Sequence, residues 1–130
     1  ANKNVGDRAE IVIDGREILS RGERGLNVVA YHRGKLVLQE SFDTHDDDKE
    51  SDRFADAIDR LQYGSYVVIA VQDEANKQFN ARGQSALESL GAGKGLRRRP
   101  HRSSYYCIGM KGLPTGQAIE EGSKKLLSYP

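Results

Sequence analysis

The stretch Tyr66–Gln72, which reads YVVIAVQ, decides the fold class that the sequence predicts. Five consecutive apolar residues, mostly β-branched, are typical of a strand that is covered on both faces. Residues 26–32, LNVVAYH, have the same character because Val28, Val29 and Ala30 are contiguous. We therefore expect both runs to be central strands of a β-sheet.

Shorter runs with the composition of strands surround these two. Most of them alternate between apolar and polar residues, which predicts peripheral strands. They cover residues 9–14, 16–19, 35–42 and 104–110. Asp14-Gly15 and Arg33-Gly34 each separate two such runs by two residues, and these pairs predict hairpin turns of the primed type.

Two segments have helical periodicity. Residues 51–62 carry Phe54, Ala57, Ile58 and Leu61 at spacings of three to four, which gives one apolar face. Residues 80–90 form the second segment, and Gly91 is placed to end it. The mixture predicts an α+β fold in one compact domain over residues 1–130, with two helices laid on a sheet or a pair of sheets.

Composition excludes several classes of protein. Of the 130 residues, 37% are hydrophobic and 30% charged, which is enough apolar content to fold. No run approaches 18 apolar residues, and residues 1–10 lack the apolar stretch of a signal peptide, so we expect no membrane insertion. The chain is then either intracellular or a mature form or excised domain. Its single cysteine, Cys107, permits no intrachain disulfide and is expected to be a buried, inert thiol.

The near-neutral net charge of +1 hides two opposed segments. Residues 40–59 hold nine acidic and two basic residues, a net charge of −7. Residues 94–111 hold six basic residues and no acidic one, a net charge of +6. Part of the acidic run, 46–52, precedes or opens the first predicted helix, where the helix dipole favours carboxylates. Both segments are otherwise either polar recognition surfaces or solvated loops.

Familiar catalytic and metal-binding motifs are absent. The glycines of 91–95 lack the spacing of a phosphate-binding loop, and Asp46, Asp47 and Asp48 lack that of a calcium loop. His32, His45 and His101 are far apart in the sequence and show no zinc-binding pattern. We therefore expect no metal, no cofactor and no enzymatic activity.

The basic tract 97–102, RRRPHR, is followed by Tyr105 and Tyr106. Arginine binds phosphates, sulfates and carboxylates, and aromatic rings stack on bases or sugars. The tract thus fits nucleic acid or glycan. The isoelectric point of about 8.1 lies below the value near 9 that is typical of nucleic-acid-binding domains. Nucleic acid is therefore the less favoured partner.

Five blocks of the sequence resemble, in order and spacing, those of the interleukin-like EMT inducer domain, also called the GG domain. The blocks are RGLNVV (24–29), SFDT (41–44), VQDEA (71–75), SLG (89–91) and YYCIGMKG (105–112). The resemblance implies two facing β-sheets with flanking helices, and no catalysis. The family includes secreted cytokine-like proteins, cell-surface hyaluronidase-type proteins and the stem of the O-mannose N-acetylglucosaminyltransferase.

The resemblance to that stem domain also implies a carbohydrate site. Matched block by block, its sugar-binding arginine, aspartate and second arginine fall on Arg24, Asp73 and Arg102. Aspartate accepts hydrogen bonds from hydroxyls, and arginine donates to sugar oxygens. A purely structural ion pair between Arg24 and Asp73 is the alternative.

The chain departs from its relatives around the last of these blocks. His101 and Tyr105 stand where relatives carry tryptophans, and they join Arg99 as candidates for the rim of the site. The arginines 97–99 extend this rim and favour acidic or sulfated glycans. The paired cysteines of the cytokine-like members are absent.

The sequence thus predicts a non-catalytic carbohydrate-binding module of a larger extracellular or surface-associated protein, with a glycan or glycoconjugate as partner. A secreted signalling or protein-interaction domain is the first alternative. Nucleic-acid binding through residues 94–102 is the second. The sequence does not indicate the oligomeric state.

Overall fold

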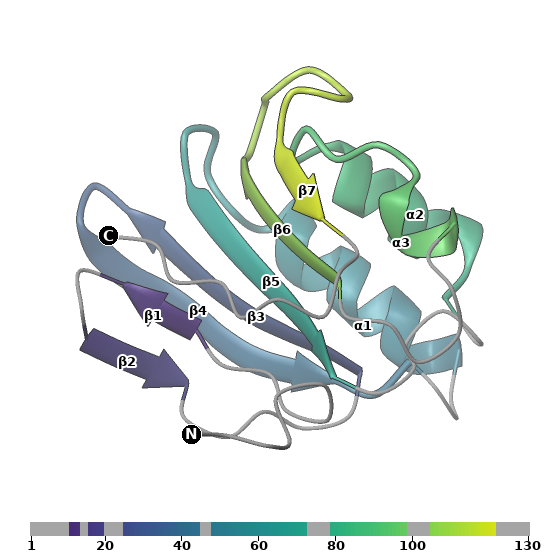
Figure 1. Cartoon of the computed structure of the whole chain (residues 1–130), viewed down its shortest axis with the longest axis horizontal. Helices are drawn as coiled ribbons and strands as arrows, with labels where there is room; N and C mark the ends of the chain where they lie inside the picture. The colour runs from purple at the N-terminus through teal and green to yellow at the C-terminus, as the bar shows by residue number, and fades with distance from the viewer. Residues whose placement is uncertain are drawn as a thin grey trace.

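The computed structural model describes residues 11–13, 16–19, 25–44, 48–72, 79–98 and 105–121, which form an α+β fold (Figure 1). The strands are β1 (Ile11–Ile13), β2 (Arg16–Leu19), β3 (Gly25–His32), β4 (Lys35–Phe42), β5 (Tyr66–Gln72), β6 (Tyr105–Met110) and β7 (Ile119–Glu121). The helices are α1 (Asp48–Asp59), α2 (Ala81–Glu88) and the short α3 (Gly95–Arg98). The predicted fold class is confirmed.

Five of the strands form one antiparallel sheet in the order β4-β3-β5-β6-β7. The two apolar runs are β3 and β5, and both are interior strands, as predicted. The prediction that β6 is peripheral is wrong, because β7 pairs with its outer side. β7 was not predicted, since its three residues are too few to show an alternating pattern.

The sheet has two ends along its strands, the Gly25 end and the His32 end. At the Gly25 end, β3 and β6 begin while β4 and β5 finish, and Gly25 pairs with Gln72. At the His32 end, His32 pairs with Lys35 across the β3–β4 turn. The predicted primed turn at Arg33-Gly34 is confirmed by positive φ angles of 52° and 79°. The predicted turn at Asp14-Gly15 lies outside the described residues.

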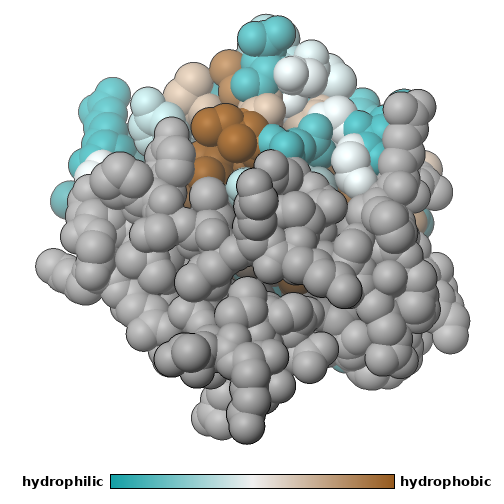
Figure 2. Space-filling view, in the orientation of Figure 1, coloured by the Kyte–Doolittle hydropathy of each residue, from teal (hydrophilic) through white to brown (hydrophobic). Residues whose placement is uncertain are grey.

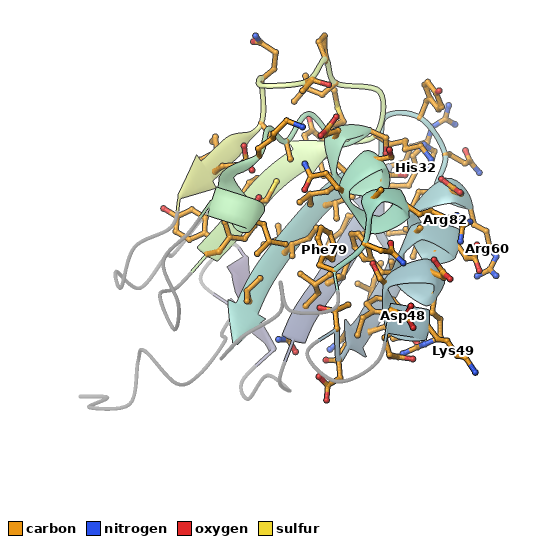
Figure 3. All side chains as sticks on the ribbon, turned by 90° about the vertical axis from the view of Figure 1, so that its right-hand side faces the viewer. His32, Asp48, Lys49, Arg60, Phe79 and Arg82 are labelled. Carbon is orange, nitrogen blue, oxygen red and sulfur yellow. The ribbon has the colours of Figure 1, made fainter. Side chains whose placement is uncertain are left out.

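The helices cover one face of the sheet (Figures 1 and 3). Leu26, Val28 and Ala30 of β3 alternate toward that face and pack in the same core as α1 and α2. The ring of Phe54 on α1 contacts Phe42 edge-on, with 5.6 Å between ring centroids. Phe79, just before α2, lies on the other side of Phe54 at 6.1 Å. This aromatic row joins β4, α1 and α2.

A buried polar contact sets how α1 meets α2. Asn80 caps α2, since its Oδ1 accepts from the backbone N–H of Gly83 at 2.9 Å and from the Ser51 hydroxyl of α1 at 2.9 Å. A Cβ on Gly83 would lie 2.3 Å from the Ser51 oxygen, so only glycine permits this approach. α1 begins at Asp48, before the predicted start at residue 51, and Asp48 and Glu50 lie in its favoured first turn.

The opposite face of the sheet is only partly exposed. Asn27 and Val29 of β3 are buried on it, whereas Val68 and Ile108 are half-buried. Figure 2 shows apolar side chains in the upper part of this side of the molecule. The expectation of two facing β-sheets is not confirmed, because the described residues form the five-stranded sheet and a separate β1–β2 hairpin, while the core lies between sheet and helices.

Candidate binding site

The Gly25 end of the sheet brings together the chain segments that carry the predicted site. Gly25 pairs with Gln72, and the neighbouring residue Val71 pairs with Tyr105. Arg24 directly precedes Gly25 and Asp73 directly follows Gln72 in the chain. Arg24, Asp73, Arg99, His101 and Arg102 themselves lie outside the described residues. The structure describes the strand ends next to them in the chain, namely the start of β3, the end of β5 and the start of β6, and these three strand ends lie side by side.

Gly25 is required where it stands. Its φ angle is +99°, and a Cβ would lie 2.2 Å from the carbonyl oxygen of Phe42. Any other residue would combine a strained backbone with a steric clash. The glycine thus lets β3 begin in direct contact with the end of β4, and it fixes the point at which the chain enters the sheet from Arg24.

A buried asparagine ties three strands together near this end. The Asn27 Nδ2 donates to the carbonyl oxygens of Ala70 at 3.2 Å and Gly25 at 3.4 Å. Its Oδ1 accepts from the hydroxyl of Ser41 at 2.7 Å. Because the side chain is fully buried, these bonds satisfy a group whose burial would otherwise be costly. The cluster holds β3, β4 and β5 in one register.

The backbone that leads into the basic tract is held by Glu120 of β7. Its carboxylate accepts from the backbone N–H of Gly93 at 2.6 Å and from the Tyr105 hydroxyl at 2.5 Å. On the other side, the Gln84 side chain donates to the carbonyl oxygen of Gly93 at 2.9 Å. Leu96 of α3 is buried in the core. Residues 91–96 are therefore a fixed support for the arginines that follow.

Tyr105 does not belong to the exposed rim of the site. Only 1% of its surface is exposed, and its hydroxyl is bonded to Glu120. The expectation that its ring is available for stacking on a ligand is therefore wrong. Tyr105 is the first residue of the interior strand β6, and its side chain belongs to the core between the sheet and the helices. Burial also raises the pKa of Tyr105 well above its ordinary value and that of Cys107 to about 12. Cys107 is buried, as predicted.

Lys111 belongs to the basic segment in the sequence but not to a basic surface. It is 8% exposed, and its Nζ donates to the carbonyl oxygens of Ile58 at 2.7 Å and Leu61 at 3.4 Å. The ammonium group therefore satisfies carbonyls at the C-terminal end of α1, where a helix favours positive charge. Lys94 is exposed and lies 3.8 Å from the carboxylate of Glu88.

The acidic segment has a structural partner. Arg82 of α2, labelled in Figure 3, forms ion pairs with Asp52, Asp56 and Asp59, whose spacing puts them on one face of α1. The hydrogen bond from Arg82 lowers the pKa of Asp56. Arg53 binds Glu40 and Glu50 in a similar way. Much of the negative charge that the sequence presents as one block is therefore paired within the helical layer.

Sequence reasoning missed Asn27, Glu120 and Lys111 as organising residues. Asn27 had a usable signal, because a lone amide inside an apolar strand requires hydrogen-bond partners. Glu120 and Lys111 had none, since their partners lie 27 and 53 residues away along the chain. Among the described residues, no group of three or more His, Cys, Asp or Glu side chains is placed to hold a metal ion.

Comparison with known proteins gives one match. Residues 24–113 match the model of the family described as interleukin-like EMT inducer. The matched segment starts at Arg24 and ends two residues after Lys111. It therefore contains the buried lysine and the three strands that converge at the Gly25 end, β3, β5 and β6. No curated protein was found to match the chain. In the described part of the chain, no helix has the length and apolar content needed to cross a membrane.

Proposed function

The chain belongs to the interleukin-like EMT inducer family, and from this premise we propose that it is a non-catalytic carbohydrate-binding module. The family is not known for catalysis, and its domains are generally extracellular. We place the module accordingly in a larger extracellular or surface-associated protein. Its ligand is a glycan or glycoconjugate.

The observation that carries this proposal is the convergence at the Gly25 end. Gly25 and Gln72, which adjoin Arg24 and Asp73 in the chain, lie opposite each other on β3 and β5. The neighbouring strand β6 begins just after the basic tract, at Tyr105, which pairs with Val71 of β5. Binding sites for weak ligands gain affinity when their groups are held before the ligand arrives. Three features would hold the backbone beside the site in place: Gly25, where no larger residue fits, the hydrogen bonds of Asn27, and the contacts of Glu120.

The chemistry of the three residues suits a sugar. Arg24 and Arg102 donate hydrogen bonds to ring, glycosidic or N-acetyl oxygens, while Asp73 accepts from neighbouring hydroxyls. Arg99 adds positive charge at the rim and His101 adds a hydrogen-bonding group, and the charge favours a glycan with carboxylate or sulfate groups. With Tyr105 buried, recognition relies on hydrogen bonds and charge more than on stacking by this ring.

A glycan array on the whole chain tests the proposal, with Asp73→Ala and Arg102→Ala as site variants. Arg60→Ala and Asp59→Ala are the matched controls, because both remove exposed charges of the same type from the end of α1. We expect binding to one glycan class that both site variants reduce at least tenfold and both controls retain. Absence of binding by a protein shown to be folded by circular dichroism would refute the proposal.

Salt dependence separates the alternatives. Binding through many phosphate contacts weakens steeply with salt, whereas a glycan held mainly by hydrogen bonds, with one or two acidic groups, loses much less affinity. A loss of several hundredfold between 50 and 200 mM salt would thus favour nucleic acid. The buried position of Lys111 argues for the glycan, because it removes one positive charge from the surface that nucleic acid would need.

A further inference from the structure

β4 is an edge strand with exposed apolar side chains. In the sheet order it is the first strand, and among the described residues it pairs only with β3. Leu36 and Val37 are 48% and 49% exposed. An eight-residue edge strand that presents apolar side chains is a template for pairing with another strand.

A groove of about 260 Å³ runs beside this edge, between β4 and the C-terminal end of α1. Its floor is apolar, with Leu38 and Val37 from β4 and Leu61 after α1. His32 and Arg60, labelled in Figure 3, line it on the polar side. Its volume lies just below the roughly 300–1,000 Å³ of sites for drug-sized ligands, and it leaves room for apolar side chains of a partner.

A β-bulge determines which side chains of β4 share a face. Ala30 pairs with Leu38 but the next residue, Tyr31, pairs with Leu36, so Val37 is an extra residue without a partner on β3. Val37 and Leu38 consequently both face the groove, although they are consecutive. Lys35 and Glu40 face the same side as these two, whereas Leu36 and Gln39 face the other side of the sheet.

This arrangement selects one antiparallel register between two copies of the strand. Side chains that lie opposite each other in a sheet must share a face. Pairing Val37 of one copy with Leu38 of the other satisfies this condition for every pair, because Leu36 then meets Gln39 and Lys35 meets Glu40. A shift by one or two residues in either direction places groove-side residues opposite residues of the other face.

We infer that two copies of this chain associate through β4 in that register, forming one continuous ten-stranded sheet about a twofold axis. The register is complementary in charge, because each Lys35 faces Glu40 of the second copy. Glu40 is held in place by Arg53, yet its side chain stays 42% exposed and within reach of the second copy. Val37 of each copy enters the groove beside Leu38 of the other, which removes the exposed apolar surface of both.

The pairing has a consequence for the carbohydrate function proposed above, although it does not depend on it. β4 ends at the Gly25 end of its sheet, so antiparallel pairing places the two Gly25 ends at opposite extremes of the joined sheet. The dimer thus presents two sites to one long or multiply branched glycan, and two weak sites bind such a ligand more tightly than one.

Sedimentation velocity of the whole chain at increasing concentration tests the inference. We expect the sedimenting species to change from a monomer of 14.4 kDa to a dimer of twice that mass. Lys35→Glu, which places two carboxylates opposite each other, and Val37→Lys should each raise the dissociation constant at least tenfold. Ile119→Lys on the opposite edge strand is the matched control, because Ile119 is also 49% exposed. It should leave the dissociation constant unchanged.

Disulfide trapping tests the register itself. Because Leu36 lies opposite Gln39 of the second copy, the double variant Leu36→Cys/Gln39→Cys should oxidise to a covalent dimer. Each single variant should form little covalent dimer, since its new thiol has no thiol opposite. A chain that is monomeric at all concentrations, or a dimer that Ile119→Lys disrupts and Val37→Lys does not, would overturn the inference. Circular dichroism of each variant establishes that it is folded.

Discussion

The two ends of the five-stranded sheet are built on different principles. At the Gly25 end, strands approach through a glycine in contact with a carbonyl, and a fully buried asparagine bonds to three strands. At the His32 end, Tyr63 and Tyr66 are largely exposed and a groove opens beside β4. One end is closed by buried polar contacts, whereas the other leaves apolar surface open.

The difference assigns separate tasks to the two ends. Buried hydrogen bonds specify one arrangement, because each misplacement leaves a polar group without a partner. Such an end suits a site that must hold several side chains in fixed positions. An open apolar edge specifies less by itself and acquires its order from whatever covers it. This contrast is the reason why we propose the glycan site at the first end and the contact with a second copy at the other.

Substitution of two of the glycines with positive φ angles, Gly25 and Gly34, measures the contrast between the two ends most directly. Gly25→Ala should destabilise the domain by about 2–5 kcal/mol, because it adds a clash with Phe42 to the cost of a left-handed backbone. Gly34 has a φ angle of +79° but open space around it. Gly34→Ala should therefore lower the free energy of unfolding by only about 1–2 kcal/mol. Urea unfolding of both variants makes the comparison. Equal losses would show that the Gly25 end is no tighter than the other.

Lys111→Met tests whether the His32 end also depends on one buried polar contact. The substitution keeps much of the apolar stem but leaves the carbonyl oxygens of Ile58 and Leu61 without the ammonium group. We expect a loss of about 1–3 kcal/mol in the free energy of unfolding. Lys94→Met is the control, because Lys94 is exposed, and it should change stability by less than about 0.5 kcal/mol. A loss as small as that of the control would contradict this role.

The pH dependence of stability reports whether water is excluded from the core around Cys107, next to Tyr105. Burial raises the pKa of its thiol from 9.0 to about 12, so the folded protein keeps a proton that the unfolded chain releases. Stability is therefore complete below about pH 9 and falls as the pH rises toward 12, by at most about 1.4 kcal/mol per pH unit. Thermal unfolding between pH 8 and 10 should show a steeper decline for the native chain than for Cys107→Ala. Parallel curves would indicate an accessible thiol.

The elements with strong local patterns were predictable. β3, β5 and both longer helices follow from apolar periodicity, and the turn at Arg33-Gly34 follows from its two residues. β7 and α3 were not predictable, because three or four residues carry too little pattern and are held mainly by contacts distant in sequence. The bulge at Val37 is likewise absent from any local signal, and it arises from how β4 fits β3.

The positions of the site residues stay a prediction, whereas the strands beside them can be compared with the structure. The sequence placed Arg24 and Asp73 next to central strands, and the pairing of Gly25 with Gln72 agrees with that placement. It also placed Tyr105 at the rim, where the structure has a buried ring. A tyrosine beside arginines is typical of a binding surface, but the same tyrosine at the start of an interior strand is part of the core. Only the pairing of β6 with β7 distinguishes these two situations.

The carbonyl oxygens of Leu90 and Gly91 have a consequence for how this domain can change. Leu90 accepts from Met110 at the end of β6, while Gly91 accepts from Gly116 and Ala118 ahead of β7. The segments before and after the basic tract are therefore fastened to each other without using the tract itself. Doubling the length of a chain segment between two held ends costs only about 0.6 kcal/mol in entropy. Residues 99–104 connect these held segments in the sequence, so we expect that they can be exchanged for other sequences without loss of the hydrogen bonds at Leu90 and Gly91.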